Sequence, residues 1–334
     1  MISFSPHKII FLLSLLSGSF LAVSSSSWFS AWIGLELNLM SFIPLTSSSE
    51  NQLPSEASLK YFLVQALGSA IIILSSTLTF FIPMVSLSFI SLALLLKLGA
   101  APLHFWFPQV MEGLNWTQII ILMTIQKLAP MFLISYLSSE YYTHSILFLG
   151  GISSAIIGAL GGINQTSLRK ILTYSSINHL SWMLFAMLIN ETSWVIYFLM
   201  YTLISASVVS HFASTQTYFF PHLINANYSP LPKIISSMNL YSLGGLPPFS
   251  GFIPKWIITQ EMIQSSFYLP LFILLLSSLV TLYFYIRITL SSISISSTQM
   301  KWNTPLKPLK ILSSPLYTSI NLFGLLIPSI LLVI

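Results

Sequence analysis

The stretch KLGAAPLHFW, from Lys97 to Trp106, places a lysine inside a long apolar run and then interrupts that run with Gly99 and Pro102. Glycine and proline break a helix, and inside a membrane the freed backbone groups need neighbouring side chains or water. An ionisable group within a membrane span is unfavourable in free energy and usually has a function. The stretch therefore predicts a membrane protein that moves charge.

Composition supports a membrane protein along the whole chain. Of the 334 residues, 55% are hydrophobic and only 6% are charged, whereas soluble domains carry roughly 25% charged residues. The basic excess is spread thinly, so it does not indicate nucleic-acid binding. Cysteine is absent, which excludes disulfides and cysteine-held metal clusters in this chain. No phosphate-binding glycine motif indicates a nucleotide site.

The apolar runs predict an all-α, polytopic fold. A spanning helix needs about 20 mostly apolar residues, and on this basis we expect about eleven transmembrane helices. The first run is taken as a retained helix and not as a cleaved signal peptide. The predicted spans are 8–23, 26–45, 57–82, 86–108, 116–138, 145–163, 170–189, 193–218, 233–264, 268–290 and 312–333.

Basic residues set the predicted orientation. With eleven spans, nine of the twelve Lys and Arg residues fall on one face, as the positive-inside rule requires. The other face receives only acidic residues, Glu140, Glu191 and Glu261. The N-terminus is therefore predicted on the positive-inside face and the C-terminus on the opposite face. The nine basic residues are Lys8, Lys60, Arg169, Lys170, Lys233, Arg287, Lys301, Lys307 and Lys310.

Four charged residues lie near the middle of predicted spans: Glu36, Lys97, Lys127 and Lys255. Each costs roughly 2.5–3.5 kcal/mol at the membrane centre by insertion scales. Snorkelling lysines or a Glu–Lys pair that only holds helices together would be a structural explanation. The mid-span positions favour function instead.

The breaks also suggest an internal repeat. LGAAPL, at Leu98–Leu103, and LGGLPPF, at Leu243–Phe249, each interrupt the fourth span of a five-span half, and each has a lysine beside it. Paired broken helices indicate a transporter's working site. We expect residues 1–140 to form the first half, with its break near 97–103. Residues 141–290 form the second, with its break near 243–254, and a polar loop and C-terminal helix occupy 291–334.

Several blocks together resemble one family. They include WIGLELNLMSFIPL, EASLKYFLVQA, KLGAAPLHFWFP, QKLAP, GGINQTSLRKILTYSSINH and SLGGLPPFSGFIPKW, and they span about residues 28 to 290. The chain resembles the chain 2 family of mitochondrial NADH:ubiquinone oxidoreductase, respiratory complex I, and its arthropod members in particular.

The resemblance implies an antiporter-like fold of two inverted five-helix repeats and a role in proton translocation coupled to electron transfer from NADH to ubiquinone. It places Glu36, Lys97, Lys127 and Lys255 at the positions of that family's intramembrane charged residues.

The resemblance further implies that the protein lies in the mitochondrial inner membrane, with the N-terminus on the matrix side and the C-terminus on the intermembrane-space side. The expected partners are other complex I membrane subunits, accessory subunits and lipids. NADH, FMN, iron–sulfur clusters and ubiquinone are expected in partner subunits, with no cofactor in this chain.

These residues suggest a sequence of proton transfers. Burial disfavours a charged lysine and a nearby carboxylate favours it, so Glu36 is expected to control the proton on Lys97. Lys127 would accept that proton, and Lys255 would continue the path in the second half. His104, just after Pro102, is a further candidate relay, although it would equally serve as a hydrogen-bonding group at a helix end. His179 is a weaker candidate, for which a packing role is the alternative.

Two other functions remain open on the residues alone. A stand-alone cation/proton antiporter would use the same lysines and glutamate. A scaffold for assembly would need the charges only to fix helix pairing, and it would leave the paired breaks unexplained.

Overall fold

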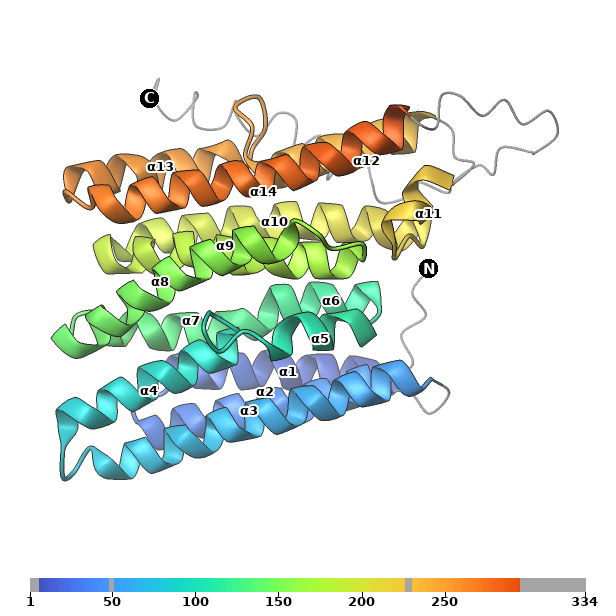
Figure 1. Ribbon diagram of the computed structural model, residues 1–334. Helices are drawn as coiled ribbons and strands as arrows, with labels where there is room; N and C mark the ends of the chain where they lie inside the picture. The colour runs from blue at the N-terminus through green and yellow to red at the C-terminus, as the bar shows by residue number, and fades with distance from the viewer. Residues whose placement is uncertain (1–5, 48–50, 226–229, 295–334) are drawn as a thin grey trace, which may run out of the picture. The chain divides into compact units, whose positions relative to one another are not determined.

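The computed structural model describes residues 6–47, 51–225 and 230–294 (Figure 1). Within these residues the secondary structure is helical, apart from one isolated antiparallel bridge between Ser167 and Phe219. The C-terminal helix predicted over 312–333 lies outside the described residues. The helices are α1 Pro6–Ser24, α2 Trp28–Thr46, α3 Gln52–Leu78, α4 Pro83–Leu98, α5 Trp106–Gly113, α6 Trp116–Met123, α7 Ile125–Leu137, α8 Tyr141–Gly162, α9 Leu168–Ile189, α10 Glu191–Thr215, α11 Phe220–Asn225, α12 Pro230–Gly244, α13 Phe252–Gln264 and α14 Tyr268–Ser294.

Helix length and composition confirm an all-helical membrane protein. Six segments of the described chain are long and apolar enough to cross a membrane: α1, α3, α6 with α7, α8, α10 and α14. The apolar α4 is shorter. Three predicted spans, 86–108, 116–138 and 233–264, each consist of two helices in succession. The count of eleven spans stays a prediction.

Many polar groups on these helices bond to the backbone of their own helix. Serine and threonine hydroxyls donate to carbonyls three or four residues earlier, as Ser75 does to Ile71 and Ser181 does to Asn178. Such bonds satisfy a hydroxyl where no water is available. The serine content is therefore compatible with spanning helices.

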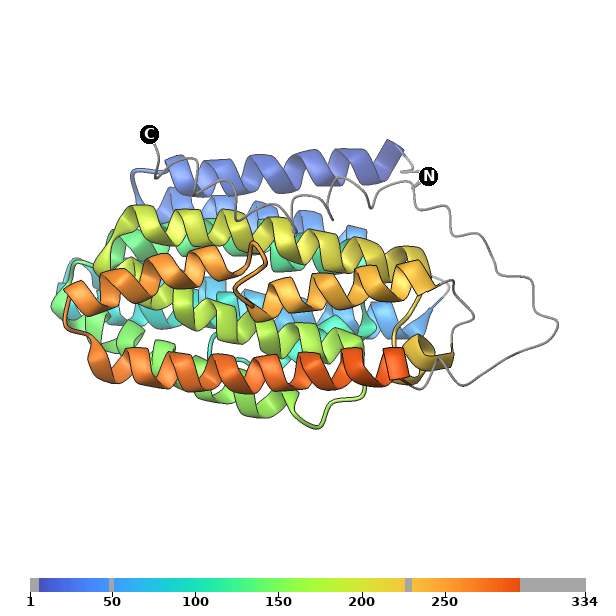
Figure 2. The same ribbon diagram turned by 90° about the horizontal axis from the view of Figure 1, so that it is seen from above.

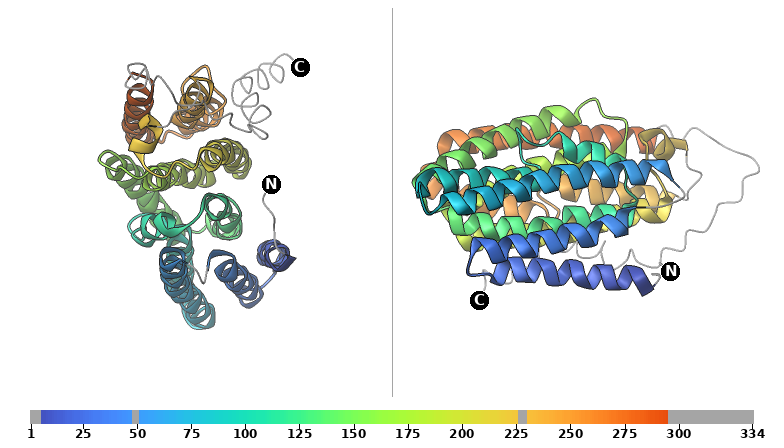
Figure 3. Two further views of the ribbon diagram at one scale, coloured as in Figure 1. Left: turned by 90° about the vertical axis from the view of Figure 1, so that its right-hand side faces the viewer. Right: turned by 90° about the horizontal axis from the view of Figure 1, so that it is seen from below.

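The chain divides into two compact units, and the boundary falls inside α8, between Ser154 and Ala155. In the first unit, α3 contacts α2, α4 and α5, while α7 contacts α1, α4 and α6. Helices α1 and α2 approach each other so closely that a Cβ on Gly34 would lie 2.8 Å from the Gly18 carbonyl oxygen. The left view of Figure 3 looks along the axes of these helices and shows them nearly parallel.

The second unit surrounds α9, most of whose side chains are buried. Helices α10, α13 and α14 all contact α9. Helices α12 and α13 follow one another almost in line, separated by a loop that is plain in Figure 2. The Leu168 N–H donates to the Tyr218 carbonyl and the Phe220 N–H donates to the Thr166 carbonyl, which joins the start of α9 to the segment after α10.

Candidate functional site

The first break lies between Leu98, where α4 ends, and Trp106, where α5 begins. Gly99 has φ +71°, a left-handed conformation that glycine adopts easily and that commonly ends a helix. Two side chains donate hydrogen bonds to carbonyl oxygens in the last turn of α4. Trp106 Nε1 donates to the Leu96 oxygen at 3.0 Å, and Gln65 Nε2 donates to the Lys97 oxygen at 3.2 Å. The backbone at this break is thus stabilised by neutral donors, and the Lys97 ammonium is not needed for it.

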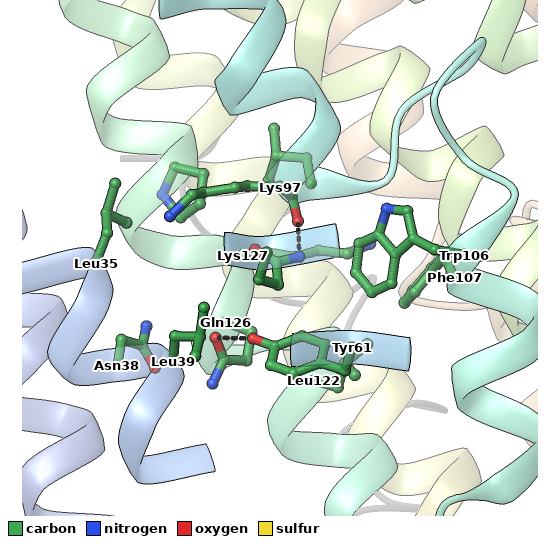
Figure 4. A pocket seen from close by; sticks show the side chains of 13 residues that line it. Leu35, Asn38, Leu39, Tyr61, Lys97, Trp106, Phe107, Leu122, Gln126 and Lys127 are labelled. Atoms are coloured by element: carbon green, nitrogen blue, oxygen red, sulfur yellow. Dashed lines mark hydrogen bonds between the residues drawn. The ribbon is translucent and has the colours of Figure 1, made fainter. Parts of the chain in front are cut away.

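Lys97 and Lys127 meet at one small cavity in the first unit (Figure 4). Their side chains are only 7% and 2% exposed. The cavity has a volume of about 20 Å³, counted as the space open to the centre of a water molecule. One water molecule needs about 10–15 Å³ of such space. The cavity lined by the two buried lysines therefore has room for a water molecule. It is lined by Leu35, Asn38, Leu39, Tyr61, Gln65, Lys97, Leu98, Trp106, Phe107, Leu122, Gln126, Lys127 and Pro130.

The helix that carries Lys127 is also irregular. Helix α6 ends at Met123 and α7 begins at Ile125, with Thr124 at φ −114° and ψ −77° between them. Pro130 follows inside α7 and has no N–H for the carbonyl four residues earlier. The Lys127 Nζ lies 5.2 Å from the centroid of the Phe107 ring, within the range of a cation–π interaction. The sequence analysis did not predict this third interruption.

Glu36 lies beside the cavity and does not line it, whereas Leu35 and Asn38 of the same helix do. It is partly buried, and its Oε2 has no hydrogen-bond partner among the residues that the structure describes. Glu36 and Lys97 form no direct ion pair. The structure thus places the predicted acid on the helix beside the cavity, and not within ion-pairing distance of the predicted lysine.

Lys255 takes a different position at the second break, in the second unit. Helix α12 ends at Gly244, Gly245 has φ +77°, and α13 begins at Phe252. The Lys255 side chain is 7% exposed, and its Nζ donates to the Gly244 oxygen at 2.8 Å. A cation at a helix C-terminus also interacts favourably with the helix dipole. At this break the lysine itself stabilises the helix end.

The two predicted histidines lie in separate units. His104 is buried between α4 and α5, with Nδ1 3.3 Å from the Pro102 oxygen, and it does not line the cavity. His179 is buried on α9, with Nδ1 2.8 Å from the Tyr197 hydroxyl. His104 has the geometry of a hydrogen-bonding group at a helix end. Among the described residues, no three His, Asp or Glu side chains come together as a metal site requires.

Four polar side chains of the cavity were missed by the sequence analysis. Asn38, Tyr61, Gln65 and Gln126 all line it and come from three different helices. A usable signal existed, because an amide in the middle of an apolar span needs a partner just as a charge does. Asn38 is two residues from Glu36, and Gln126 directly precedes Lys127.

The first break yields a stability prediction. Replacing Trp106 by Phe keeps a large ring but removes the donor to the Leu96 oxygen, so we expect a loss of about 1 kcal/mol, the usual contribution of one hydrogen bond. A lower apparent melting temperature of the purified protein would show this loss. Trp256→Phe is the control, since Trp256 is 38% exposed and the described structure gives its indole no hydrogen bond. Equal shifts for both variants would contradict the role assigned to Trp106.

Comparison with known proteins gives consistent matches. The family described as "NADH:quinone oxidoreductase/Mrp antiporter, TM" matches residues 25–83 and 81–281. Over 306 residues the chain is 46% identical to NADH-ubiquinone oxidoreductase chain 2 of Anopheles gambiae, with 88% of each chain covered. Over 316 residues it is 37% identical to the chain of the same name in Bos taurus, with 89% of this chain and 90% of that chain covered.

Solved structures match the fold. A chain of respiratory complex I from Thermus thermophilus has a TM-score of 0.82 at 23% identity, covering 98% of this chain and 81% of that chain. A chain of a membrane-bound sulfane sulfur reductase, an archaeal respiratory membrane complex, has a TM-score of 0.83 at 16% identity, covering 98% and 74%. At these identities the likeness concerns the fold alone.

Proposed function

The chain belongs to the NADH:quinone oxidoreductase/Mrp antiporter transmembrane family, and from this premise we propose that it is a core membrane subunit of respiratory complex I. In this role it translocates protons across the mitochondrial inner membrane while other subunits transfer electrons from NADH to ubiquinone. It is thus a subunit of a proton-translocating NADH:ubiquinone reductase.

One observation carries the proton-translocating role: Lys97 and Lys127 are buried and line the same cavity. Two like charges at one site repel each other, and burial disfavours each charged form. The pair is therefore suited to holding one proton that passes from Lys97 to Lys127. Glu36 favours the charged form of Lys97, so its distance from Lys97 controls when the proton leaves.

The second half continues the path under this proposal. Lys255 accepts the proton near the second break, and His179, bonded to Tyr197, is a candidate relay on the way. His104, with Nδ1 near the Pro102 oxygen, is a candidate relay in the first half.

The finer architecture is part of the same proposal. We propose about eleven spans with two inverted five-helix repeats, over 1–140 and 141–290, followed by a loop and a last helix over 291–334. The N-terminus lies on the matrix side and the C-terminus on the intermembrane-space side, which is supported by the distribution of basic residues.

Under this proposal, the redox chemistry takes place in partner subunits. The chain has no cysteine, so it offers no thiolate for an iron–sulfur cluster. NADH, FMN, the clusters and ubiquinone belong to other subunits under this proposal. The partners of this chain are neighbouring antiporter-like and small core membrane subunits, accessory subunits and inner-membrane lipids.

Mild detergent extraction tests the assignment against the two alternatives. We expect the chain to be recovered only within a large complex that oxidises NADH and, once reconstituted in liposomes, pumps protons. Recovery of an isolated chain that exchanges cations for protons would instead identify a stand-alone antiporter. Unchanged pumping after loss of the buried lysines would identify a scaffold.

A further inference from the structure

Two amide side chains in the Lys97–Lys127 cavity have hydrogen-bonding groups without partners. The Oδ1 of Asn38 and the Nε2 of Gln126 are buried and have no hydrogen-bond partner among the described residues. Both residues line the cavity. A buried donor or acceptor left unsatisfied is unfavourable, and polar cavities of sufficient size resolve this by holding an ordered water.

The orientation of the Gln126 amide is fixed by a neighbour. The Tyr61 hydroxyl donates to Gln126 Oε1 at 3.0 Å, which leaves Nε2 as the end that donates. Tyr61 is held in turn, since its ring lies 5.0 Å from that of Phe42 and 5.9 Å from that of Trp106. In the view of Figure 4 the Gln126 side chain lies between those of Asn38 and Tyr61. Of the residues that line the cavity, Gln126 thus has an oriented donor without a partner and Asn38 has an acceptor without one.

We propose that Asn38 and Gln126 are positioning residues that hold and orient one water molecule between Lys97 and Lys127. This inference rests on the proposed function and assigns its residues beyond the lysines and Glu36. Neither amide titrates, so neither competes for the proton.

A water at this site uses all four of its hydrogen bonds. It accepts from Gln126 Nε2 and from the Lys97 ammonium, and it donates to Asn38 Oδ1 and to a neutral Lys127 amine. A proton then passes from Lys97 Nζ to the water as the water passes one of its own protons to Lys127 Nζ. Lys97 becomes neutral, Lys127 becomes charged, and the water is unchanged. Without the amides the water is free to turn, and the connection between the lysines is lost for much of the time.

The test uses the assembled complex with Asn38→Leu, Gln126→Met and the double variant, each close in size to the natural residue. Proton pumping into liposomes is measured per assembled complex. We expect each single variant to slow pumping by roughly tenfold, the effect of one positioned hydrogen bond. The double variant should be no slower than the slower single one, because both residues act on the same water. Multiplied effects in the double variant, as for two independent packing defects, would overturn the inference.

Two further measurements separate positioning from packing. Pumping by the single variants in D₂O should be slowed more than pumping by the natural complex, because proton transfer between the lysines has become limiting. Tyr61→Phe keeps the ring but frees the Gln126 amide, so it should also slow pumping, and it serves as the test if a cavity variant fails to assemble. Tyr136→Phe is the matched control, because its hydroxyl bonds to the Val23 oxygen away from the cavity at 3.3 Å.

Failure of the inference is distinguishable from failure of the proposed function. If Lys97→Met and Lys127→Met stop pumping while all amide variants pump normally, only the positioning role is wrong. If the lysine variants themselves pump normally, the proposed function is wrong. A high-resolution structure of the complex should show water density within hydrogen-bonding distance of both amides, and a dry cavity would contradict the inference.

Discussion

Replacing Lys127 by Met is expected to reduce proton pumping coupled to NADH oxidation by roughly tenfold or more, with the complex still assembled. Methionine has a similar length and suits a buried apolar site, but it cannot carry a proton. Lys127 is 2% exposed and lines the water-sized cavity with Lys97, so its loss leaves one amine where the proposed transfer needs two. The measurement is the pumping rate of the reconstituted complex, with assembly checked by the amount of intact complex on a native gel. Lys97→Met should behave in the same way.

Lys60→Met is the control for this change. Lys60 pairs with Glu56 at 2.6 Å on the surface of α3, with the two side chains 44% and 61% exposed. Such an exposed pair contributes little to stability, and it lies outside the cavity. The Lys60 variant should pump normally. Normal pumping by the Lys127 variant in a fully assembled complex would refute the role of Lys127.

Gly251→Ala is expected to abolish assembly of the chain into the complex. Gly251 closes the second break just before α13, and a Cβ there would overlap the Ser242 carbonyl oxygen. The obstacle is backbone and cannot rotate away, so α12 and α13 would have to separate. The amount of assembled complex, measured on a native gel, should fall to a small fraction of normal.

Gly244→Ala makes the same chemical change at the same break and should be tolerated. A Cβ on Gly244 would meet only Tyr285 and Leu282 side-chain atoms, at 3.6 and 3.8 Å, which is ordinary contact. Because both variants add one methyl group within the same stretch, a difference between them isolates the close approach at Gly251. Equal assembly of the two would contradict the conformation of the break.

The sequence analysis located the features that cost free energy in a membrane. The family and the all-helical membrane fold are confirmed. Lys97, Lys127 and Lys255 were found because each is a charge in an apolar run, and the structure buries all three. Glycine and proline likewise predicted breaks near Gly99 and Gly245, where the backbone is left-handed. Such signals are local, so one sequence suffices to detect them.

Features that depend on distant contacts were not predictable in this way. The interruption at Thr124 uses a residue that fits within a helix, and only the conformation reveals it. Tyr61 reaches Gln126 from 65 positions away. Nothing in the spacing of Lys255 from Gly244 shows that the ammonium bonds to that carbonyl, because the contact depends on the path of the intervening loop.

The hydrogen bond from Lys255 Nζ to the Gly244 oxygen links the protonation of Lys255 to the position of the end of α12 at the second break. A charged donor makes a stronger bond than a neutral one, so a proton on Lys255 tightens the join between α12 and α13. Linkage requires the converse as well. Under the proposed function, a displacement of the end of α12 would therefore be coupled to the transfer of the proton on Lys255.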